Sequence, residues 1–475
     1  MRRNYDVILK KVLERIKPTE RERKKLLTLS ERALKLCDTE AKKYKGKAIL
    51  AGSLTRDTWL KDKNEFDIFL VFPKSVNEQK LEKLGLSIGK KVIKKLKGKW
   101  IIEYAQHPYV RGKVRGVQID IVPCYKIKPG EKIISAVDRT PLHVAYLDKN
   151  FPEELSNDVR LLKQLCNANK IYGADAKTQG FSGYVCELLV LYYRGFLNLL
   201  KNVVNWKPGQ IIDIENFYEK KDYRMLRRKF KNQVLILIDP IDKERNAGAA
   251  ISAVSFFKLK KLAKEFLEKP REELFFPKEV QPISEGELIV KQMKRRTELI
   301  LVTFKPPKVV PDILWPQLRK FAERLENILK EYEFEVLRKD VYTNEKDLAV
   351  VLLEMQVSKL PSVDKRVGPS VFDLDDSERF INKYKNIALT GPFIEKNYWC
   401  VEVKRKFDNA REKLKDSLKE KVEILKAKGI PNYIAEQIAK RFEIISENEK
   451  ILKLVKKDEN FGRFLKEYFE KESLV

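Results

Sequence analysis

The sequence predicts an α+β protein with several domains, and three observations lead to this class. Alternating apolar and polar residues at 65–72 and 117–123 are typical of strands. Apolar residues at helical spacing fill the segments on either side of these strands. The chain has 475 residues, 43% of them hydrophobic, which is enough for three or four domains of ordinary size.

The first 150 residues predict a mixed sheet with helices packed on it. Apolar spacing indicates helices at 4–16, 20–43 and 78–97, and the capping box Thr19-Glu20-Arg21-Glu22 marks the start of the second helix. Strand patterns occur at 48–50, 65–72, 100–105, 109–114 and 117–123. His107 lies between two of these strands, where it either fixes a turn or lies beside a functional site.

The middle of the chain, from about residue 155, is predicted to be mostly helical. The pattern indicates an apolar helix from 185 to about 200, a buried strand at 234–240, a helix beginning at Lys243 and a basic helix at 257–267. The segment 269–286 contains Pro and Glu and is expected to be a linker. Two boundaries follow, and they divide the chain into domains 1–150, 151–285 and 286–475.

The C-terminal third predicts a small sheet of its own. A strand at 298–304, a helix at 316–332 and strands at 333–339 and 348–357 form a β-α-β-β run, which suggests a ferredoxin-like or RNA-recognition-like sheet. A short helix at 380–385 and a strand at 398–403 follow. Residues 406–475 are expected to be mostly charged helix.

Three carboxylates and a Gly-Ser turn are the strongest candidates for chemistry. Glu65 and Asp67 share one face of a predicted strand, and Asp120 projects from the polar face of another. Acidic groups this close either raise each other's pKa or require a cation, and magnesium bound to a triphosphate is the obvious cation. Together they can hold two hard cations about 3.5–4 Å apart for nucleotidyl transfer. The turn at Gly52-Ser53 allows backbone N–H groups to approach a phosphate.

The charge balance indicates a phosphate polymer as partner. The chain carries 98 Lys and Arg against 69 Asp and Glu, a net charge of +29, and an ion-pair-rich surface alone does not explain this excess. Five cysteines without a C-x-x-C pair indicate a reducing compartment. The N-terminus lacks the apolar core of a signal peptide, and the longest apolar run, 188–200, is too short to span a membrane. We therefore expect a cytoplasmic protein with no membrane partner.

Several short sequence motifs, taken together, are similar to those of class I, archaeal-type CCA-adding enzymes, the tRNA nucleotidyltransferases of the polymerase-beta-type superfamily. The motifs are Gly52-Ser53-Leu54-Thr55-Arg56-Asp57-Thr58-Trp59-Leu60, His107-Pro108-Tyr109-Val110, Asp120-Ile121-Val122-Pro123-Cys124-Tyr125, Asp138-Arg139-Thr140-Pro141-Leu142-His143 and Phe181-Ser182-Gly183-Tyr184. One departure is Glu65, which stands where the superfamily commonly has Asp. It leaves open which metal ion Glu65 contacts.

The resemblance implies a role for each matching residue. Glu65, Asp67 and Asp120 would be catalytic and would bind two Mg²⁺ ions. Gly52, Ser53 and Arg56 would contact the triphosphate, and Arg245 would read the base edge. The remaining nucleotide-binding residues would hold phosphate or sugar, and they are Thr140, His143, Lys163 and Tyr172. Taken alone, Lys163 would be an ordinary surface lysine and Arg245 would pair locally.

The implied activity is template-independent addition and repair of the 3′-terminal CCA of tRNA from CTP and ATP. Domain 1–150 would be catalytic, 151–285 would bind nucleotide and primer, and 286–475 would bind the acceptor end and arm of tRNA. The alternatives are a poly(A)-type or oligoadenylate-type polymerase, a non-catalytic RNA-binding protein, and an enzyme that modifies a small molecule. The sequence leaves open a homodimer, the tRNA contacts and the mechanism of the switch from C to A.

Overall fold

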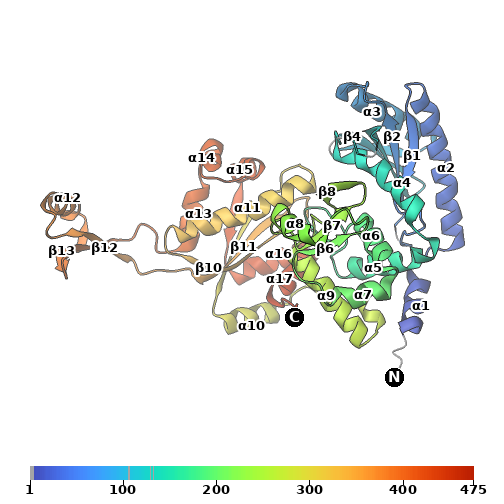
Figure 1. The fold of residues 1–475 in the computed structure, drawn as a ribbon. Helices are drawn as coiled ribbons and strands as arrows, with labels where there is room; N and C mark the ends of the chain where they lie inside the picture. The colour runs from blue at the N-terminus through green and yellow to red at the C-terminus, as the bar shows by residue number, and fades with distance from the viewer. Residues whose placement is uncertain (1–4, 62, 105–106, 129, 132, 475) are drawn as a thin grey trace. The chain divides into compact units, whose positions relative to one another are not determined.

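The computed structural model describes residues 5–61, 63–104, 107–128, 130–131 and 133–474 (Figure 1). The chain separates into two compact units, the first comprising residues 1–278 with 473–475 and the second residues 279–472. Both units combine helices and sheets, so the predicted α+β class is confirmed.

The first sheet of unit 1 has five strands in the order β1-β2-β5-β4-β3. The strands are β1 (Lys47–Ala51), β2 (Glu65–Phe72), β3 (Lys99–Tyr104), β4 (Pro108–Val114) and β5 (Val117–Tyr125). β2 and β5 run parallel, whereas the other pairs are antiparallel. The predicted mixed sheet is therefore confirmed, and β2 and β5, which carry the three acids, are neighbours.

Helices cover both faces of this sheet. α2 (Glu20–Lys42) and α3 (Glu78–Lys95) pack on one face against Phe66, Ile68 and Ile121. The other face packs Phe69 and Val122 against α4 (Thr140–Asn150). The predicted capping box at Thr19 is present, with reciprocal bonds between the Thr19 and Glu22 side chains and backbone. Because alternate residues of β2 face opposite sides, Glu65 and Asp67 share the face that α4 covers only in part.

A second core of unit 1 lies mainly in the helical segment that follows. Its helices are α1 (Tyr5–Ile16), α5 (Ser156–Ala168), α6 (Gly183–Tyr193), α7 (Phe196–Val203) and α9 (Ala253–Glu268). α8 (Tyr223–Lys229) lies beside a three-stranded sheet, β6-β7-β8, formed by β6 (Gln210–Asp213), β7 (Leu235–Asp239) and β8 (Asp242–Asn246). The N-terminal helix α1 thus packs with the central segment rather than with the five-stranded sheet.

Two predictions for this segment are wrong. The helix expected from 185 to about 200 breaks between α6 and α7, because Arg194 and Gly195 adopt positive φ values of 53° and 120°. The helix expected at Lys243 is instead strand β8, which forms a hairpin with β7. The Asn246 side chain accepts from Leu237 N–H and donates to the Leu235 carbonyl, and these bonds hold the strand conformation; the helix begins only at Ala253, capped by Ser252.

Unit 2 is built on a four-stranded antiparallel sheet in the order β10-β11-β9-β15. Its strands are β9 (Glu298–Phe304), β10 (Glu335–Thr343), β11 (Ala349–Val357) and β15 (Phe442–Ile445). α11 (Pro311–Lys330) joins the first two, so the order corresponds to the 4-1-3-2 pattern of a ferredoxin-like sheet. The prediction is confirmed, and the fourth strand comes from the segment expected to be mostly helix.

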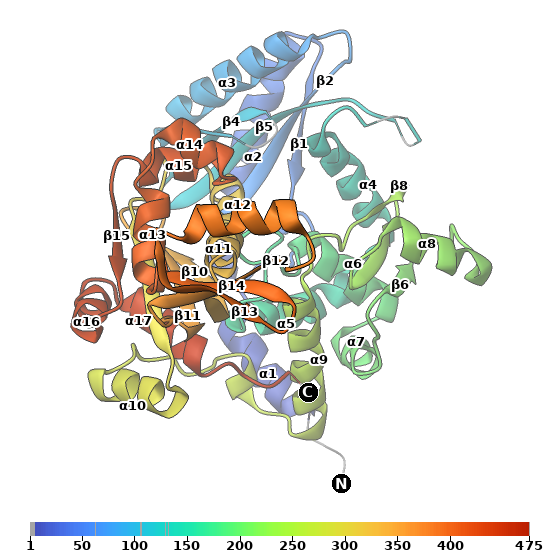
Figure 2. The ribbon, with the colours of Figure 1, turned by 90° about the vertical axis from the view of Figure 1, so that its left-hand side faces the viewer.

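The rest of unit 2 comprises a smaller sheet and further helices. The smaller sheet, in the order β12-β14-β13, consists of β12 (Val363–Ser370), β13 (Ala388–Glu395) and β14 (Tyr398–Lys404). α12 (Leu374–Tyr384) lies across it (Figure 2) and is longer than the short helix expected. The other helices are α10 (Glu285–Arg295), α13 (Ala410–Leu418), α14 (Val422–Ala427), α15 (Asn432–Ile438), α16 (Asn448–Lys457) and α17 (Glu459–Phe469).

Candidate active site

The turn after β1 brings backbone directly against an acidic side chain. Ala51 pairs with Asp67 across β1 and β2, and Asp67 pairs with Asp120 across β2 and β5. Gly52 has φ +87°, and a Cβ at that position would meet Asp67 Oδ2 at 3.0 Å. Only glycine therefore allows the turn to approach Asp67 so closely. The strand register therefore places Asp67 and Asp120 beside the Gly-Ser turn, as the sequence predicted.

The electrostatics around Asp67 are those of a crowded anionic site. Burial raises the pKa of Asp67, and the charges of Asp120 and Glu65 raise it further, to about 7. Glu65 lies at the exposed start of β2. A carboxyl group with this pKa is half protonated near neutrality, and a divalent cation would displace its proton. The pKa of Asp67 thus indicates a place where positive charge is favoured.

Arg111 was not singled out by the sequence, and the structure places it on Asp120. The two residues pair directly across β4 and β5. The Arg111 guanidinium donates from Nε to Asp120 Oδ1 at 2.9 Å and from Nη2 to Oδ2 at 2.8 Å. Nη2 also donates to Tyr109 Oη at 2.8 Å. The alternation along 109–114 put Arg111 and Tyr109 on one face, but only the strand register shows that this face is shared with Asp120.

The donor atoms of the three acids do not surround a single point. Within the described residues, the donor atoms of Glu65, Asp67 and Asp120 are not all within 4.8 Å of one another. Like charges repel, and Arg111 already neutralises Asp120. Two cations about 3.5–4 Å apart are bridged by a wider set of oxygen ligands than one cation needs. The carboxylate oxygens on β2 and β5 are ligands of the kind that hard divalent ions prefer.

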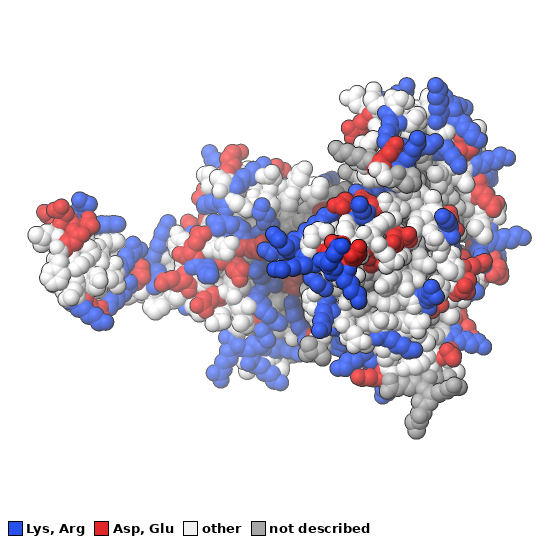
Figure 3. Space-filling model, viewed as in Figure 1, with Lys and Arg blue, Asp and Glu red and all other residues white. Residues whose placement is uncertain are grey.

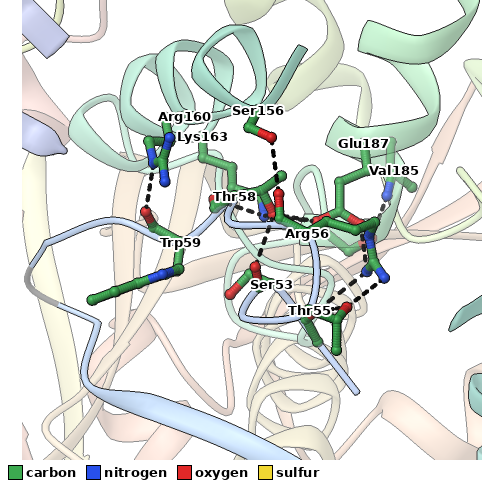
Figure 4. Close-up of polar contacts among 12 residues, drawn as sticks. Ser53, Thr55, Arg56, Thr58, Trp59, Ser156, Arg160, Lys163, Val185 and Glu187 are labelled. Carbon is green, nitrogen blue, oxygen red and sulfur yellow. Dashed lines mark hydrogen bonds and ion pairs between the residues drawn. The ribbon is translucent and has the colours of Figure 1, made fainter. Parts of the chain in front are cut away.

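A buried ionic network lies next to the turn, and its centre is Glu187 of α6 (Figure 4). Arg56 Nη2 lies 2.9 Å from Glu187 Oε2, and Lys163 Nζ lies 3.1 Å from Oε1. The Thr58 hydroxyl donates to Glu187 Oε1 at 2.5 Å and accepts from Lys163 at 2.9 Å. Burial would raise the pKa of Glu187, but Lys163 and Arg56 outweigh it and lower the pKa. Arg56 also pairs with the half-exposed Asp148 at 3.1 Å, so Glu187 is the buried anion that Arg56 and Lys163 share.

Lys163 is therefore not the surface lysine that its sequence position alone would suggest. Its side chain is 2% exposed, on the inward side of α5. A Cβ on Gly183 would lie 3.1 Å from Tyr172 Oη and 3.7 Å from Lys163 Nζ, so the absence of a side chain at Gly183 lets both groups approach α6. Ser182 caps α6 by accepting from Val185 N–H. Burial raises the pKa of Tyr172, and the charges of Glu187 and Glu65 add to the rise.

Two of the predicted nucleotide-binding residues contact one buried carboxylate, that of Asp239, and we call this cluster the Asp239 hub. Asp239 is 0% exposed and lies at the end of β7. His143 Nε2 lies 2.9 Å from Asp239 Oδ2, and Arg245 Nη1 pairs with the same oxygen. Tyr184 Oη donates to Oδ1 at 3.1 Å and its ring stacks on His143 at 4.0 Å. Thr140 lies one helical turn before His143, at the start of α4.

Asp239 and Glu187 hold the predicted site residues in place, and sequence reasoning did not single them out. Each is an acid within a run of apolar residues, 235–239 or 185–190, and a buried acid inside such a run was the available signal. Arg245 lies on strand β8, not at a helix start, so it is aimed by a hairpin and by Asp239. His107 precedes β4, four residues from Arg111, or about 13 Å along an extended chain. It does not lie beside the acids.

Comparison with protein families gives three matches along the chain. The nucleotidyltransferase domain model matches residues 30–143, the second domain of tRNA nucleotidyltransferase matches 157–276, and the C-terminal domain of the CCA-adding enzyme matches 295–447. These matches define the class of protein as a tRNA nucleotidyltransferase. Proteins of the nucleotidyltransferase class use divalent metal ions, and the acidic groups on β2 and β5 are suited to that use.

Individual relatives narrow the class. The chain is 36% identical to the CCA-adding enzyme of Methanocaldococcus jannaschii over 93% of its own length and 96% of the relative's. It is 34% identical to that of Methanosarcina mazei over 96% of the chain and 97% of the relative, and 37% identical to that of Methanococcus maripaludis over 92% and 96%. The chain belongs to the CCA-adding enzyme family.

Solved structures add nothing to this conclusion. The structure of E. coli MS115-1 CdnC with ATP covers 57% of this chain and 94% of that chain, with a TM-score of 0.41 and 15% identity. That similarity is too low to support an argument. Within the part of the chain that the structure describes, every helix is too short or too polar to cross a membrane.

Proposed function

We propose that the protein adds, and repairs, the 3′-terminal CCA of tRNA, using CTP and ATP and releasing pyrophosphate. The observation that carries this proposal is the pairing of Asp67 with Asp120 beside the Gly52 turn, in a chain that matches CCA-adding enzymes over more than nine-tenths of its length. A poly(A)-type polymerase would share the acids, but the match of residues 295–447 to a CCA-adding enzyme domain favours the first activity.

Glu65, Asp67 and Asp120 would hold two Mg²⁺ ions, because their donor atoms are all carboxylate oxygens. Bound divalent ions lower the pKa of an attacking hydroxyl and neutralise a leaving pyrophosphate. Arg111 is the residue that balances Asp120 in this arrangement. Its guanidinium would also limit how the Asp120 carboxylate can rotate, since both oxygens accept from it.

The incoming triphosphate would lie against the turn and the ionic network. Gly52 and Ser53 would offer backbone N–H groups, and Arg56 would offer its charge. Glu187 holds Arg56 and Lys163 in place, so the cations are positioned before a ligand arrives. Such positioning reduces the reorganisation that binding would otherwise require.

The sugar and base would be held by the Asp239 hub. Asp239 orients the imidazole of His143 and the guanidinium of Arg245 from one buried position. Arg245 has a planar, forked set of donors that suits a base edge or a phosphate. Tyr172 and Thr140 complete the expected set, with Tyr172 close to Lys163. Selection of C and A would then depend on groups fixed by the protein.

We propose that the chain has three functional regions. Residues 1–150 would supply catalysis, 151–285 would hold nucleotide and primer, and 286–475 would bind the tRNA arm. The packing of α1 into the second core means that the first region includes a helix anchored in the second. The C-terminal region, which contains the ferredoxin-like sheet, would bind RNA by shape and backbone, because its sequence shows no base-reading motif.

The deciding experiment is nucleotide incorporation into tRNA trimmed before CCA. The enzyme is given labelled CTP, labelled ATP, or both, and the added nucleotides are sequenced. We expect two C residues from CTP alone and a completed CCA from the mixture. Long runs of A in the absence of CTP would support the polymerase alternative, and no incorporation at all would support a non-catalytic RNA-binding protein.

A further inference from the structure

His107 is buried and forms no hydrogen bond to any of the residues that the structure describes. The residue is 4% exposed, and within that part of the chain neither Nδ1 nor Nε2 has a hydrogen-bond partner. Buried polar atoms in folded proteins are almost always satisfied, and an unsatisfied one calls for an explanation such as a bound ion. The chain has only two histidines, and the other one, His143, is bonded to Asp239.

Two carboxylates face the Nδ1 atom of His107. Glu78 and Glu82 lie four residues apart in α3, so both project from one side of its N-terminal turns. Nδ1 lies 3.7 Å from Glu78 Oε1 and 3.5 Å from Glu82 Oε1. Among the described residues, these three side chains form the one group whose possible metal-ligand atoms all lie within 4.8 Å of one another.

The spacing suits a metal ion better than direct hydrogen bonds. A hydrogen bond from Nδ1 to a carboxylate requires about 2.7–3.2 Å, and both separations exceed this. Ligands about 2.0–2.2 Å from a tetrahedral zinc ion lie about 3.3 Å from one another. The two distances from Nδ1 to a carboxylate oxygen, 3.7 and 3.5 Å, are close to that value.

We propose that Glu78, Glu82 and His107 bind a divalent transition-metal ion, Zn²⁺, at a site separate from the catalytic acids. The imidazole nitrogen selects zinc over Mg²⁺, which prefers oxygen ligands only. The Glu78 side chain is 71% exposed and that of Glu82 is 34% exposed, so an ion can enter from solvent and keep water as a further ligand. The ion would tie the start of α3 to the residue that precedes β4, at the opposite end of β4 from Val114.

The test uses the full-length protein with Co²⁺ as a spectroscopic substitute for Zn²⁺. Excess Mg²⁺ is present throughout to occupy oxygen-only sites, and Co²⁺ is titrated while its visible absorption is recorded. We expect one Co²⁺ with a nitrogen ligand, displaced by Zn²⁺. His107→Gln and Glu82→Gln should each weaken binding by at least about tenfold. His143→Gln is the matched histidine control and should leave the absorption unchanged, as should Asp67→Asn, which alters the catalytic acids.

Three results would overturn the proposal. They are absence of a Co²⁺ band in the wild-type protein, an unchanged affinity in both His107→Gln and Glu82→Gln, and loss of the band in His143→Gln but not in His107→Gln. If near-ultraviolet circular dichroism shows that His107→Gln is misfolded, Glu82→Gln decides, because its side chain lies on the partly exposed side of α3. Zn²⁺ should also raise the Tm of the wild type and not that of Glu82→Gln.

Discussion

Replacing Glu187 by Gln tests whether the buried network at the proposed triphosphate site works as a unit. The Glu187 and Lys163 side chains are 3% and 2% exposed, and that of Arg56 is 8% exposed. The substitution keeps the shape but leaves two buried cations without their anion, except for the contact of Arg56 with the half-exposed Asp148. Breaking a buried ion pair from one side costs about 3–5 kcal/mol. We expect the free energy of unfolding, measured in urea, to fall by that amount.

A double-mutant cycle with Lys163→Met makes the test quantitative. Lys163→Met removes one of the stranded cations, so the double variant should be more stable than the sum of the two single effects by about 2 kcal/mol. The control is Glu449→Gln, which breaks an exposed pair with Lys453 and should change the free energy by less than about 0.5 kcal/mol. A coupling energy below about 0.5 kcal/mol between Glu187 and Lys163 would refute the reasoning.

Three other outcomes are expected. Asp120→Ala should abolish nucleotide incorporation but leave tRNA affinity, measured by filter binding, nearly unchanged, because Asp120 contacts no base or phosphate in the proposal. Unit 2 should lose stability as the pH falls from about 4.5 towards 2. Burial raises the pKa of Glu354, but hydrogen bonds from Arg295, Thr297 and Tyr468 outweigh burial and lower the pKa to about 2. The stabilisation by the Glu354 carboxylate is complete above its unfolded pKa and is on the order of 3 kcal/mol. Glu354→Gln should therefore lose less stability than the wild type over this pH range. Finally, the exposed basic segment around α8, visible as a dense group of blue side chains in Figure 3, should bind RNA phosphates. Replacing Arg224 and Arg228 by Gln should weaken tRNA binding and reduce its salt slope by about 0.9 per lost contact.

Each of these expectations has a result that contradicts it. Wild-type incorporation by Asp120→Ala would remove the metal assignment. An acid transition of unit 2 that is identical in Glu354→Gln would show that the Glu354 carboxylate does not set it. An unchanged salt slope in the α8 variant would show that this surface does not contact RNA. The control replaces the exposed Arg21 and Arg32 of α2 by Gln, an equal change of charge, and should leave the slope unchanged.

Local patterns of residue type determined much of the architecture by themselves. The period of two along 65–72 and 117–123 assigned each side chain to a face, so Glu65 and Asp67 were placed together and Asp120 on the polar side of its strand. The Thr19 capping box and the β-α-β-β run of unit 2 were equally local, because they depend on residues within a few positions of one another. The folded chain retains each of these features.

Only the tertiary structure decided which side chains meet across long stretches of sequence. Arg111 contacts Asp120 because of the register of β4 and β5. Lys163 is buried against Glu187. Asp239 contacts His143, which is 96 residues away in the sequence. Arg245 lies on a strand because Asn246 bonds to β7, which local helix signals do not reveal. The strength of a charge pair depends on the distance between the charges and on the exclusion of water from them. Neither quantity can be predicted from the spacing of residues along the chain.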